Sequence, residues 1–395
     1  MLNNMSKDPI SLHRKLRGKI FVGSKITPLK RDDIKLIYTP GVAKVSQYIF
    51  HNPDQKYSLT SKGNNVAIVT DGTRVLGLGN IGADAALPVM EGKSVLYHEY
   101  GKINAFPICL NTTDKTKIIE TILAIEPVFG AINLEDIESP KVLDISRELE
   151  KKLSIPVFHD DRHGTAVVVL AGLINSLKLA NKRMSEIKTV IAGAGSAGYC
   201  IAQLLNFEGF KNIVVVDSKG AIFKGRKINM NKYKEEITKF TNPKEKGTLS
   251  EVLIDADIFI GVSGIKNLLK GNMIKTMKKN PIIFALTNPD PEIDPLVAKK
   301  AGAKVVASGS YKYGNQVNNA LVFPYLMRAI LDLKIQKISM EILCVTALAI
   351  ANTVSKKELS ENHIIPNLGD ERLQKRITAS LTKLQKNKKY ACIAM

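Results

Sequence analysis

Short apolar runs rich in β-branched residues alternate with longer, helix-like segments along most of this chain. The runs occupy residues 66–70, 105–110, 128–133 and 156–158, and then residues 189–192, 212–216, 258–260, 281–286 and 304–307. Parallel strands need crossover connections, which are usually helices, so this alternation indicates an α/β fold with mostly parallel sheets. The two sets of runs predict two such domains.

The segment between the two sets marks a domain boundary. Residues 164–179 are predicted to form one long helix with apolar or small residues almost all round, so this helix should be buried between layers. Residues 1–60 are predicted to be helical and rich in turns. We expect an N-terminal α/β domain over residues 1–155, and a doubly wound, Rossmann-like domain with extra C-terminal helices over residues 156–395.

The composition is that of a globular protein. Of the 395 residues, 45% are hydrophobic, enough for well-buried cores in two or three domains. The first residues contain no apolar stretch typical of a signal peptide, and nowhere do about 18 apolar residues follow one another. We therefore expect no membrane association and a cytoplasmic location. Four cysteines without paired spacing are expected to be free thiols: Cys109, Cys200, Cys344 and Cys392.

The chain is strongly basic. It has 57 Lys and Arg against 37 Asp and Glu, a formal charge of +20, which favours anionic partners through long-range attraction. The lysines are spread over the whole length, and aromatic residues are 6% with no Trp, so no stacking platform for single strands is indicated. We interpret the charge as a solvated lysine-rich surface and expect no specific nucleic acid partner.

A glycine-rich turn follows the run at 189–192 and precedes a helical segment. Its residues are Gly193, Ala194, Gly195, Ser196, Ala197 and Gly198. The next apolar run ends at Asp217, 19 residues after Gly198. In dinucleotide sites of this pattern, backbone N–H groups at the helix start hold the pyrophosphate, and the acid contacts the adenosine ribose. The sequence therefore predicts a dinucleotide site.

Asp217 also bears on the choice between NAD and NADP. An acid at this position disfavours a 2′-phosphate, whereas Lys219, Lys224 and Arg226 lie nearby in the sequence and could accept one. We predict NAD, with NADP as the alternative. A second GxGxxG pattern, at residues 77–82, lacks an acid at the corresponding distance and is interpreted as a substrate-side loop.

Four carboxylates stand in two adjacent pairs about 25 positions apart, each at the end of an apolar run. They are Glu135, Asp136, Asp160 and Asp161. Hard divalent cations such as Mg²⁺ and Mn²⁺ take oxygen ligands, and acids at the ends of two neighbouring strands could close on one ion. The two pairs therefore suggest a metal site beside the dinucleotide.

Three further residues are ambiguous when taken alone. Arg74, flanked by glycines, could clamp a carboxylate with its planar fork of donors, or it could be an ordinary surface arginine. Lys93 could be solvated, but a lysine close to a divalent cation and out of water would have a lowered pKa and could act as a general base. Tyr38 precedes a Pro-Gly turn and could simply be a packing residue.

Taken together, these stretches resemble the malic enzymes, in particular their short prokaryotic form. The matching stretches are residues 38–42, 70–79, 87–93, 133–136, 158–161, 164–166, 193–198, 287–289 and 314–319. They follow one another in order across nearly the whole chain, from about residue 12 to residue 335. So many ordered blocks are far more specific than any one motif.

The resemblance implies a role for each matching residue. Lys93 falls where the family keeps its general base, Tyr38 where it keeps its general acid, and Asp160 where a carboxylate would orient Lys93. The divalent metal would be held by Glu135, Asp136 and Asp161. Arg74, Lys93, Asn288 and Asn319 would contact the substrate. The cofactor would be held by residues 193–198, Asp217, Asn288, Asn318 and Asn319.

The implied activity is oxidative decarboxylation of L-malate to pyruvate and CO₂, with reduction of NAD(P) and with Mg²⁺ or Mn²⁺. In the short form the tyrosine can come from the partner subunit, which implies a homodimer. Two alternatives remain open: a malolactic enzyme, which would convert malate to lactate and CO₂ without net reduction of NAD, and a catalytically silent nicotinamide-binding regulator.

The chain departs from the family pattern in three places. Asn80 replaces an acid common in longer relatives, residues 97–100 read Tyr-His-Glu-Tyr instead of a Phe-Lys-Glu-Phe-like segment, and residues 308–314 are unlike the usual stretch. None of these changes removes a proposed catalytic group. The altered segment before Asn315 could change the choice of substrate or the response to effectors.

Overall fold

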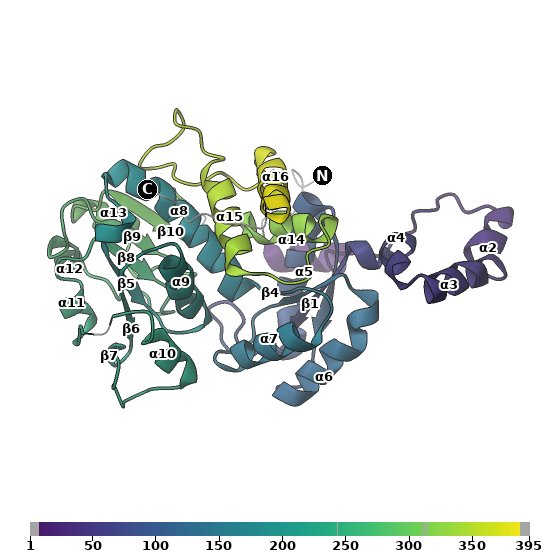
Figure 1. Ribbon diagram of the computed structural model, residues 1–395, viewed down its shortest axis with the longest axis horizontal. Coiled ribbons are helices and arrows are strands. Elements are labelled where there is room, and N and C mark those ends of the chain that lie inside the picture. The colour runs from purple at the N-terminus through teal and green to yellow at the C-terminus, as the bar shows by residue number, and fades with distance from the viewer. Residues whose placement is uncertain (1–7, 243, 311, 313, 388–395) are drawn as a thin grey trace.

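The computed structural model describes residues 8–242, 244–310, 312 and 314–387. The chain forms two α/β domains and an N-terminal arm, residues 20–60, which extends away from both (Figure 1). The described cysteines, Cys109, Cys200 and Cys344, form no disulfide with one another, and Cys392 lies outside the described residues.

The first domain is built on a four-stranded parallel sheet of order β2-β1-β3-β4. Its strands are β1 (Asn65–Thr70), β2 (Asn104–Cys109), β3 (Ala131–Leu134) and β4 (Val157–His159). The connecting helices are α5 (Gly82–Gly101), α6 (Lys115–Ile125) and α7 (Lys141–Lys152). Leu134 pairs with both Val69 and His159, so β1, β3 and β4 end at the same edge of the sheet.

The second domain is doubly wound, with the strand order β7-β6-β5-β8-β9-β10. Its strands are β5 (Lys188–Ala192), β6 (Asn212–Asp217), β7 (Gly220–Ala221), β8 (Ile258–Gly261), β9 (Ile282–Ala285) and β10 (Val305–Ser308). Only β7 is antiparallel among them. The associated helices are α9 (Ser196–Phe207), α10 (Lys232–Ile237), α11 (Leu249–Val252), α12 (Gly271–Lys275) and α13 (Pro295–Lys300). The predicted parallel α/β fold is confirmed; the two-residue strand β7 was not predicted.

The predicted long helix is α8 (Thr165–Ala180), which directly follows a π-helical turn at Asp160–Gly164. By length and composition, Asp160–Ala180 is apolar enough to cross a membrane, but 83% of it is buried inside the protein. Such a helix is equally typical of a protein core, because both settings demand apolar side chains on every face. Here α8 packs between α9 and α15 (Met340–Ala351), as the sequence indicated.

The C-terminal helices cover both domains. α14 (Phe323–Asp332) packs on α5, α15 packs on α8, and α16 (Arg372–Asn387) packs on α14 and α15. The first sheet also takes its fourth strand, β4, from beyond residue 155. The division of the chain at residue 155 stays a prediction, and these contacts join the two predicted domains closely.

The N-terminal arm has almost no core of its own. The first helix, α1 (Pro9–Leu16), precedes the arm, which carries α2 (Arg31–Ile37), α3 (Gly41–His51) and α4 (Lys56–Leu59). This confirms the predicted helical, turn-rich character of the region for the described residues. Large apolar side chains on the arm are nonetheless exposed, among them Phe21 at 91% and Phe50 at 80%. The arm therefore leaves large apolar side chains in contact with solvent, which is unfavourable.

An ionic network joins α7 of the first domain to the second domain. Arg147 on α7 donates to Glu236 on α10, with Nη1–Oε1 at 2.8 Å, and to the hydroxyl of Tyr199 on α9 at 2.6 Å. Its guanidinium also lies over the ring of Tyr233, 4.6 Å from the centroid, and Tyr233 donates to Asp144 of α7. The hydrogen bonds from Arg147 lower the pKa of Glu236 to about 2.

Replacing Glu236 with Gln should destabilise the protein in a pH-dependent way. The folded-state pKa of Glu236 is depressed below its ordinary value of 4.5, so its contribution is present above about pH 4.5 and lost as the pH falls towards 2. We expect a loss of about 1 kcal/mol at pH 7, typical of a partly exposed ion pair. Urea unfolding at pH 7 and at pH 3 would measure it.

The matched control is Glu148→Gln, because Glu148 pairs with Lys152 within the same helix, at 3.0 Å, and joins no domains. Its loss should be smaller, because this pair is exposed to solvent. A difference between Glu236→Gln and the unmodified protein that stays constant from pH 7 to pH 3 would contradict the electrostatic explanation.

Candidate active site

A cleft of about 1070 Å³ opens between the carboxyl ends of the two sheets. Strands β5, β8 and β9 end in register, because Gly261 pairs with both Ala192 and Ala285. Ligands of open α/β sheets bind at the carboxyl ends of strands. The cleft lining includes most of the predicted site residues: Arg74, Lys93, Glu135, Asp136, Asp160, Asp161, Gly195, Ser196, Ala197, Asn288, Asn318 and Asn319.

Lys93 lies at the centre of the buried part of the cleft. It is on α5, and its ammonium contacts Glu135 Oε2 at 2.7 Å and Asp160 Oδ2 at shorter range. Its Nζ also lies over the ring of Phe323, 4.1 Å from the centroid. Lys93 and Asp160 are almost fully buried, so this ion pair is shielded from solvent.

Neutral side chains hold the two carboxylates in place. Asn319 donates to Asp160 Oδ2 at 2.6 Å, which links the C-terminal half of the chain to the end of β4. Asn133 donates to Glu135 Oε2 at 2.9 Å and accepts a hydrogen bond from Tyr97 at 2.6 Å. These contacts fix the direction from which each carboxylate meets the lysine.

The carboxylates control the protonation of Lys93. Burial by itself lowers the pKa of Lys93, but attraction to Asp160 and Glu135 and the hydrogen bonds to them outweigh burial, so the pKa is raised. The sequence led us to expect a lowered pKa next to a divalent cation. The two carboxylates therefore favour the protonated form of the amine.

The acidic side chains in this part of the cleft outnumber its one cation, Lys93. Burial, followed by repulsion from Glu135, raises the pKa values of Asp136 and Asp161. Asp136 Oδ2 and Asp160 Oδ1 are buried and have no hydrogen-bond partner. Among the described residues, no three His, Cys, Asp or Glu side chains already form a closed set of ligands. The unpartnered Oδ2 of Asp136 and the crowding of acids nonetheless fit a divalent cation.

Arg74 lies in the loop after β1, and its backbone N–H donates to the carbonyl of Asp136 at 3.0 Å. Its exposed guanidinium forms no ion pair within the described part of the chain and lies opposite Gly264 of the second domain. The glycine pattern at residues 77–82 belongs to the same loop, and Gly77 and Gly79 line the cleft. Arg74 is therefore free to meet an anion in the cleft.

The second glycine-rich turn joins β5 to α9. A Cβ on Gly193 would lie 2.5 Å from the Val262 carbonyl oxygen, and one on Gly198 would lie 1.9 Å from the Gly193 oxygen, so both positions require glycine. A Cβ on Gly195 would meet nothing within 4 Å. That residue instead exposes the start of α9 to the cleft, as a pyrophosphate site requires.

Asp217, at the end of β6, is held by side chains of its own domain. Its Oδ2 accepts hydrogen bonds from Arg226 and from Lys234 Nζ, the latter at 2.7 Å, and its Oδ1 accepts the N–H of Lys219 at 2.8 Å. Arg226 also donates to the carbonyls of Gly220 and Ile228 and is almost fully buried. Arg226 is therefore engaged within the protein and is not available to a phosphate.

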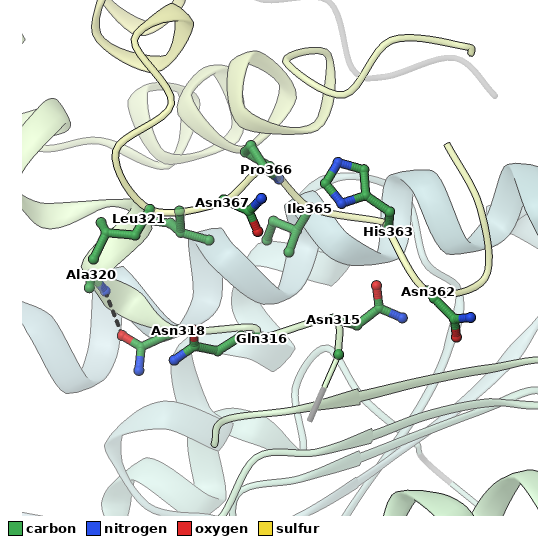
Figure 2. A pocket seen from close by; sticks show the side chains of 12 residues that line it. Asn315, Gln316, Asn318, Ala320, Leu321, Asn362, His363, Ile365, Pro366 and Asn367 are labelled. Atoms are coloured by element: carbon green, nitrogen blue, oxygen red, sulfur yellow. Dashed lines mark hydrogen bonds between the residues drawn. The ribbon is translucent and has the colours of Figure 1, made fainter. Parts of the chain in front are cut away.

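The amides Asn288, Asn318 and Asn319 all face the cleft. A smaller cavity of about 270 Å³ lies between residues 314–321 and the segment at 362–368 (Figure 2). Asn315 fastens that segment, because it donates to the carbonyl of Glu361 at 2.6 Å and accepts from Ile364 at 3.0 Å. Of the unusual stretch at 308–314, residues 311 and 313 lie outside the described residues.

Tyr38 does not join this group. It ends α2 on the N-terminal arm, its side chain is 69% exposed, and it is absent from the cleft lining. The structure of one chain therefore brings together the predicted base, acids and amides, and leaves the predicted general acid on the arm.

Family comparisons agree with this architecture. Residues 22–120 match the malic enzyme N-terminal domain, and residues 163–384 match the malic enzyme NAD binding domain. The chain belongs to the malic enzyme family. The bifunctional malic/malolactic enzyme of Bacillus subtilis is 48% identical over 96% of this chain and 93% of its own length. The NAD-dependent malic enzyme of Geobacillus stearothermophilus is 46% identical over 95% of this chain and 77% of its own.

Solved malic enzyme structures have the same fold. The NAD-dependent malic enzyme of Thermotoga maritima superposes with a TM-score of 0.91 and 44% identity, covering 95% of this chain and 99% of that one. The NADP-dependent malic enzyme of Escherichia coli is 40% identical over 93% of this chain, which spans 50% of that protein. Relatives named as NAD-dependent and as NADP-dependent thus have similar sequence identities to this chain, 46% and 40%.

Sequence reasoning missed the residues that support Lys93 and its carboxylate partners. Asn133 lies in an apolar strand, and a buried amide among apolar residues was a usable signal for a polar network. Tyr97 was noted only as a departure from the family pattern. Nothing in the sequence pointed to Phe323 beneath Lys93, because their contact depends on how α14 crosses α5.

Proposed function

We propose that this member of the malic enzyme family catalyses the oxidative decarboxylation of L-malate to pyruvate and CO₂, with NAD as the oxidant. The proposal rests mainly on the buried Lys93, which lies between Glu135 and Asp160 in a cleft that the NAD-binding domain also lines. An amine placed between acids is suited to take a proton from a substrate hydroxyl once its own proton has been passed on.

Asp160 would receive that proton. Burial raises its pKa and it already contacts Lys93 Nζ, so Asp160 would take the proton once Glu135 no longer holds the ammonium. Asn319 keeps Asp160 oriented. The deprotonated Lys93 would take the C2 hydroxyl proton of malate, while Arg74 holds a substrate carboxylate. Bound NAD would supply the acceptor for the C2 hydride, with Asn288 and Asn318 beside its nicotinamide end.

A divalent cation, Mg²⁺ or Mn²⁺, would be held by Glu135, Asp136 and Asp161. The unpartnered Asp136 oxygen and the raised pKa values of Asp136 and Asp161 support this assignment. When bound, the cation would act as a Lewis acid towards the C2 oxygen during loss of CO₂. If Glu135 also bound the divalent cation, it would attract the Lys93 ammonium less strongly, and the amine would lose its proton more easily.

NAD is favoured over NADP by the surroundings of Asp217. A 2′-phosphate would meet the Asp217 carboxylate, and the nearest arginine, Arg226, is fully engaged with Asp217 and backbone carbonyls. Lys234 is similarly occupied by Asp217 and the Asn229 carbonyl. Lys219 and Lys224 remain as exposed cations. They are flexible point charges without the bidentate geometry with which an arginine would hold a phosphate.

Tyr38 would protonate C3 of enolpyruvate from the partner subunit of a homodimer. The exposed apolar side chains of the N-terminal arm support the proposal that a second copy of the chain covers it. An arm of short helices with almost no core is only marginally stable by itself. Leu36 and Phe50, exposed by 73% and 80%, would be part of that contact. A cytoplasmic location stays a prediction.

A malolactic reaction is the second candidate, because the Bacillus subtilis relative is named a bifunctional malic/malolactic enzyme. It would use the same groups and release lactate. A silent regulator is less well supported, because Lys93, Asp160 and Glu135 form an intact, buried and connected group.

The test of the proposed function is turnover by the purified protein with L-malate, Mn²⁺ and either NAD or NADP. We expect NADH formation, followed at 340 nm, to equal pyruvate formation, and Lys93→Ala to lose at least about 10³-fold in kcat because the base is gone. Lactate without NADH would establish the malolactic reaction. Absence of any product would refute both enzymatic functions.

Replacing Asp217 with Asn should shift the cofactor preference towards NADP. The substitution removes the negative charge that repels a 2′-phosphate and leaves Arg226 and Lys234 without their anion. We expect the ratio of kcat/KM for NADP to that for NAD to rise about tenfold or more, as loss of one charged contact implies. Asp255→Asn, at an exposed turn of the same domain, should leave the ratio unchanged. An unaltered ratio in Asp217→Asn would contradict the assignment.

Mixing two inactive variants should restore activity if Tyr38 acts across the dimer. A heterodimer of Tyr38→Phe and Lys93→Ala has one site with both residues intact, so random reassociation should recover about one quarter of the original activity. Denaturing and refolding the two variants together, then measuring turnover, provides the test; each variant refolded alone is the control. No recovery from properly refolded mixed dimers would place Tyr38 in its own subunit's site.

A further inference from the structure

The second domain contains a buried acid that has no role in the proposed reaction. Glu292 lies in the segment after β9, and its side chain is fully buried. Burying a carboxylate is costly unless its oxygens are hydrogen-bonded. Within the described part of the chain, Glu292 accepts four hydrogen bonds, all from neutral groups. The carboxylate is therefore a common acceptor for donors from the surrounding loops.

These donors belong to the loops that follow two neighbouring strands, β8 and β9. Ser263, after β8, donates to Glu292 Oε1 through its backbone N–H and its hydroxyl, both at 3.1 Å. Thr287, after β9, donates its hydroxyl to Oε1 at 2.5 Å and its backbone N–H to Oε2 at 3.1 Å. The Thr287 hydroxyl in turn accepts the N–H of Gly264 at 3.0 Å. One carboxylate thus joins the two loops.

This arrangement requires an acceptor at both oxygens of residue 292. Oε1 accepts the backbone N–H of Ser263, and Oε2 accepts that of Thr287. A backbone N–H group can only donate, whereas an ionised carboxylate can only accept. A glutamine at this position would place its NH₂ group against one of the two N–H groups. The two loops could then not keep their present spacing.

The backbone around Glu292 is fixed as well. A Cβ on Gly261, the last residue of β8, would lie 2.4 Å from Glu292 Cδ, so the glycine leaves the room that the carboxylate occupies. The backbone N–H of Leu269 donates to the Glu292 carbonyl at 2.9 Å, and that of Asn267 donates to the Pro291 carbonyl at 3.1 Å. The carboxylate is thus held in place from the side of β8.

The two loops line one side of the cleft. Ser263, Gly264, Thr287 and Asn288 belong to the cleft lining. In the sheet, β5 and its glycine-rich turn lie between β6, which ends at Asp217, and the pair β8 and β9. A dinucleotide crosses a sheet of this kind at the glycine-rich turn, with its adenosine ribose at the acid that ends the next strand. The nicotinamide end would therefore lie over the loops that Glu292 joins.

We propose that Glu292 is a positioning residue for the nicotinamide end of the cofactor. It acts through Ser263 and Thr287, whose spacing it sets, and through Thr287 it places the neighbouring Asn288. This inference rests on the proposed function in that NAD is the cofactor. A shift of about 1 Å in the reacting groups is enough to slow a reaction strongly, so a carboxylate beneath the cleft can control the placement of the nicotinamide ring.

The test compares NADH with ADP-ribose, which lacks the nicotinamide. In Glu292→Gln, affinity for NADH measured by titration calorimetry should fall about tenfold or more, the usual effect of losing one hydrogen bond to a charged group. Affinity for ADP-ribose should change less than about twofold. Asp217→Asn is the matched control on the adenosine side, and it should weaken binding of both ligands to the same extent.

A second pair of variants tests the proposal even if Glu292→Gln fails to fold. Thr287→Val removes the hydroxyl that donates to Glu292, whereas Thr287→Ser keeps it. Thr287→Val should therefore lose NADH affinity but not ADP-ribose affinity, and Thr287→Ser should bind both ligands normally.

Three results would each overturn the assignment of Glu292: unchanged NADH affinity in folded Glu292→Gln, an equal loss for NADH and ADP-ribose, or the same NADH affinity in Thr287→Val and Thr287→Ser. Absence of NADH binding by the unmodified protein would overturn it too. Calorimetry needs no turnover, so a protein that binds NADH but does not convert malate would refute the proposed function and leave the role of Glu292 standing.

Discussion

A single buried ammonium between two buried carboxylates determines how the first domain closes. Lys93 is on the helix after β1, Glu135 follows β3 and Asp160 follows β4, so one cation ties three βα units at one sheet edge. Removing one partner of a buried pair typically costs about 3–5 kcal/mol, because the remaining charge has no compensation. Asn319 extends the same contact to the second half of the chain, because it donates to Asp160.

The same arrangement explains why the fold by itself is electrostatically incomplete. Four acids converge near one lysine, and burial with mutual repulsion raises the pKa values of Asp136, Asp160 and Asp161. Such a cluster is tolerated when a second cation shares its charge. The surplus of acid that makes the cluster unfavourable alone is therefore the property that would attract a divalent cation.

Much of the fold could be predicted because its strands are buried on both faces and appear in the sequence as continuous apolar runs. Strand β7 has two residues and no pattern to detect, so only tertiary pairing with β6 reveals it. For the site, motifs placed the charged residues correctly at the sheet edge, whereas Asn133, Tyr97 and Phe323 were missed because their contacts link distant elements. Arg226 shows the opposite error. Its position near Asp217 in the sequence suggested a cation free to bind a phosphate, but in the fold its guanidinium donates to Asp217 and to backbone carbonyls.

The N-terminal arm, unlike the two domains, buries little apolar surface within the chain. Its helices are short, and nearly every large apolar side chain on them faces solvent, so burial within the chain contributes little to its order. A partner surface that covers those side chains would stabilise the arm by mass action. If that surface belongs to a second copy, the contact that orders the arm also carries Tyr38 towards a cleft that lacks it. Assembly and completion of the active site would then be one event, and the arm would have no reason to be stable in the isolated chain.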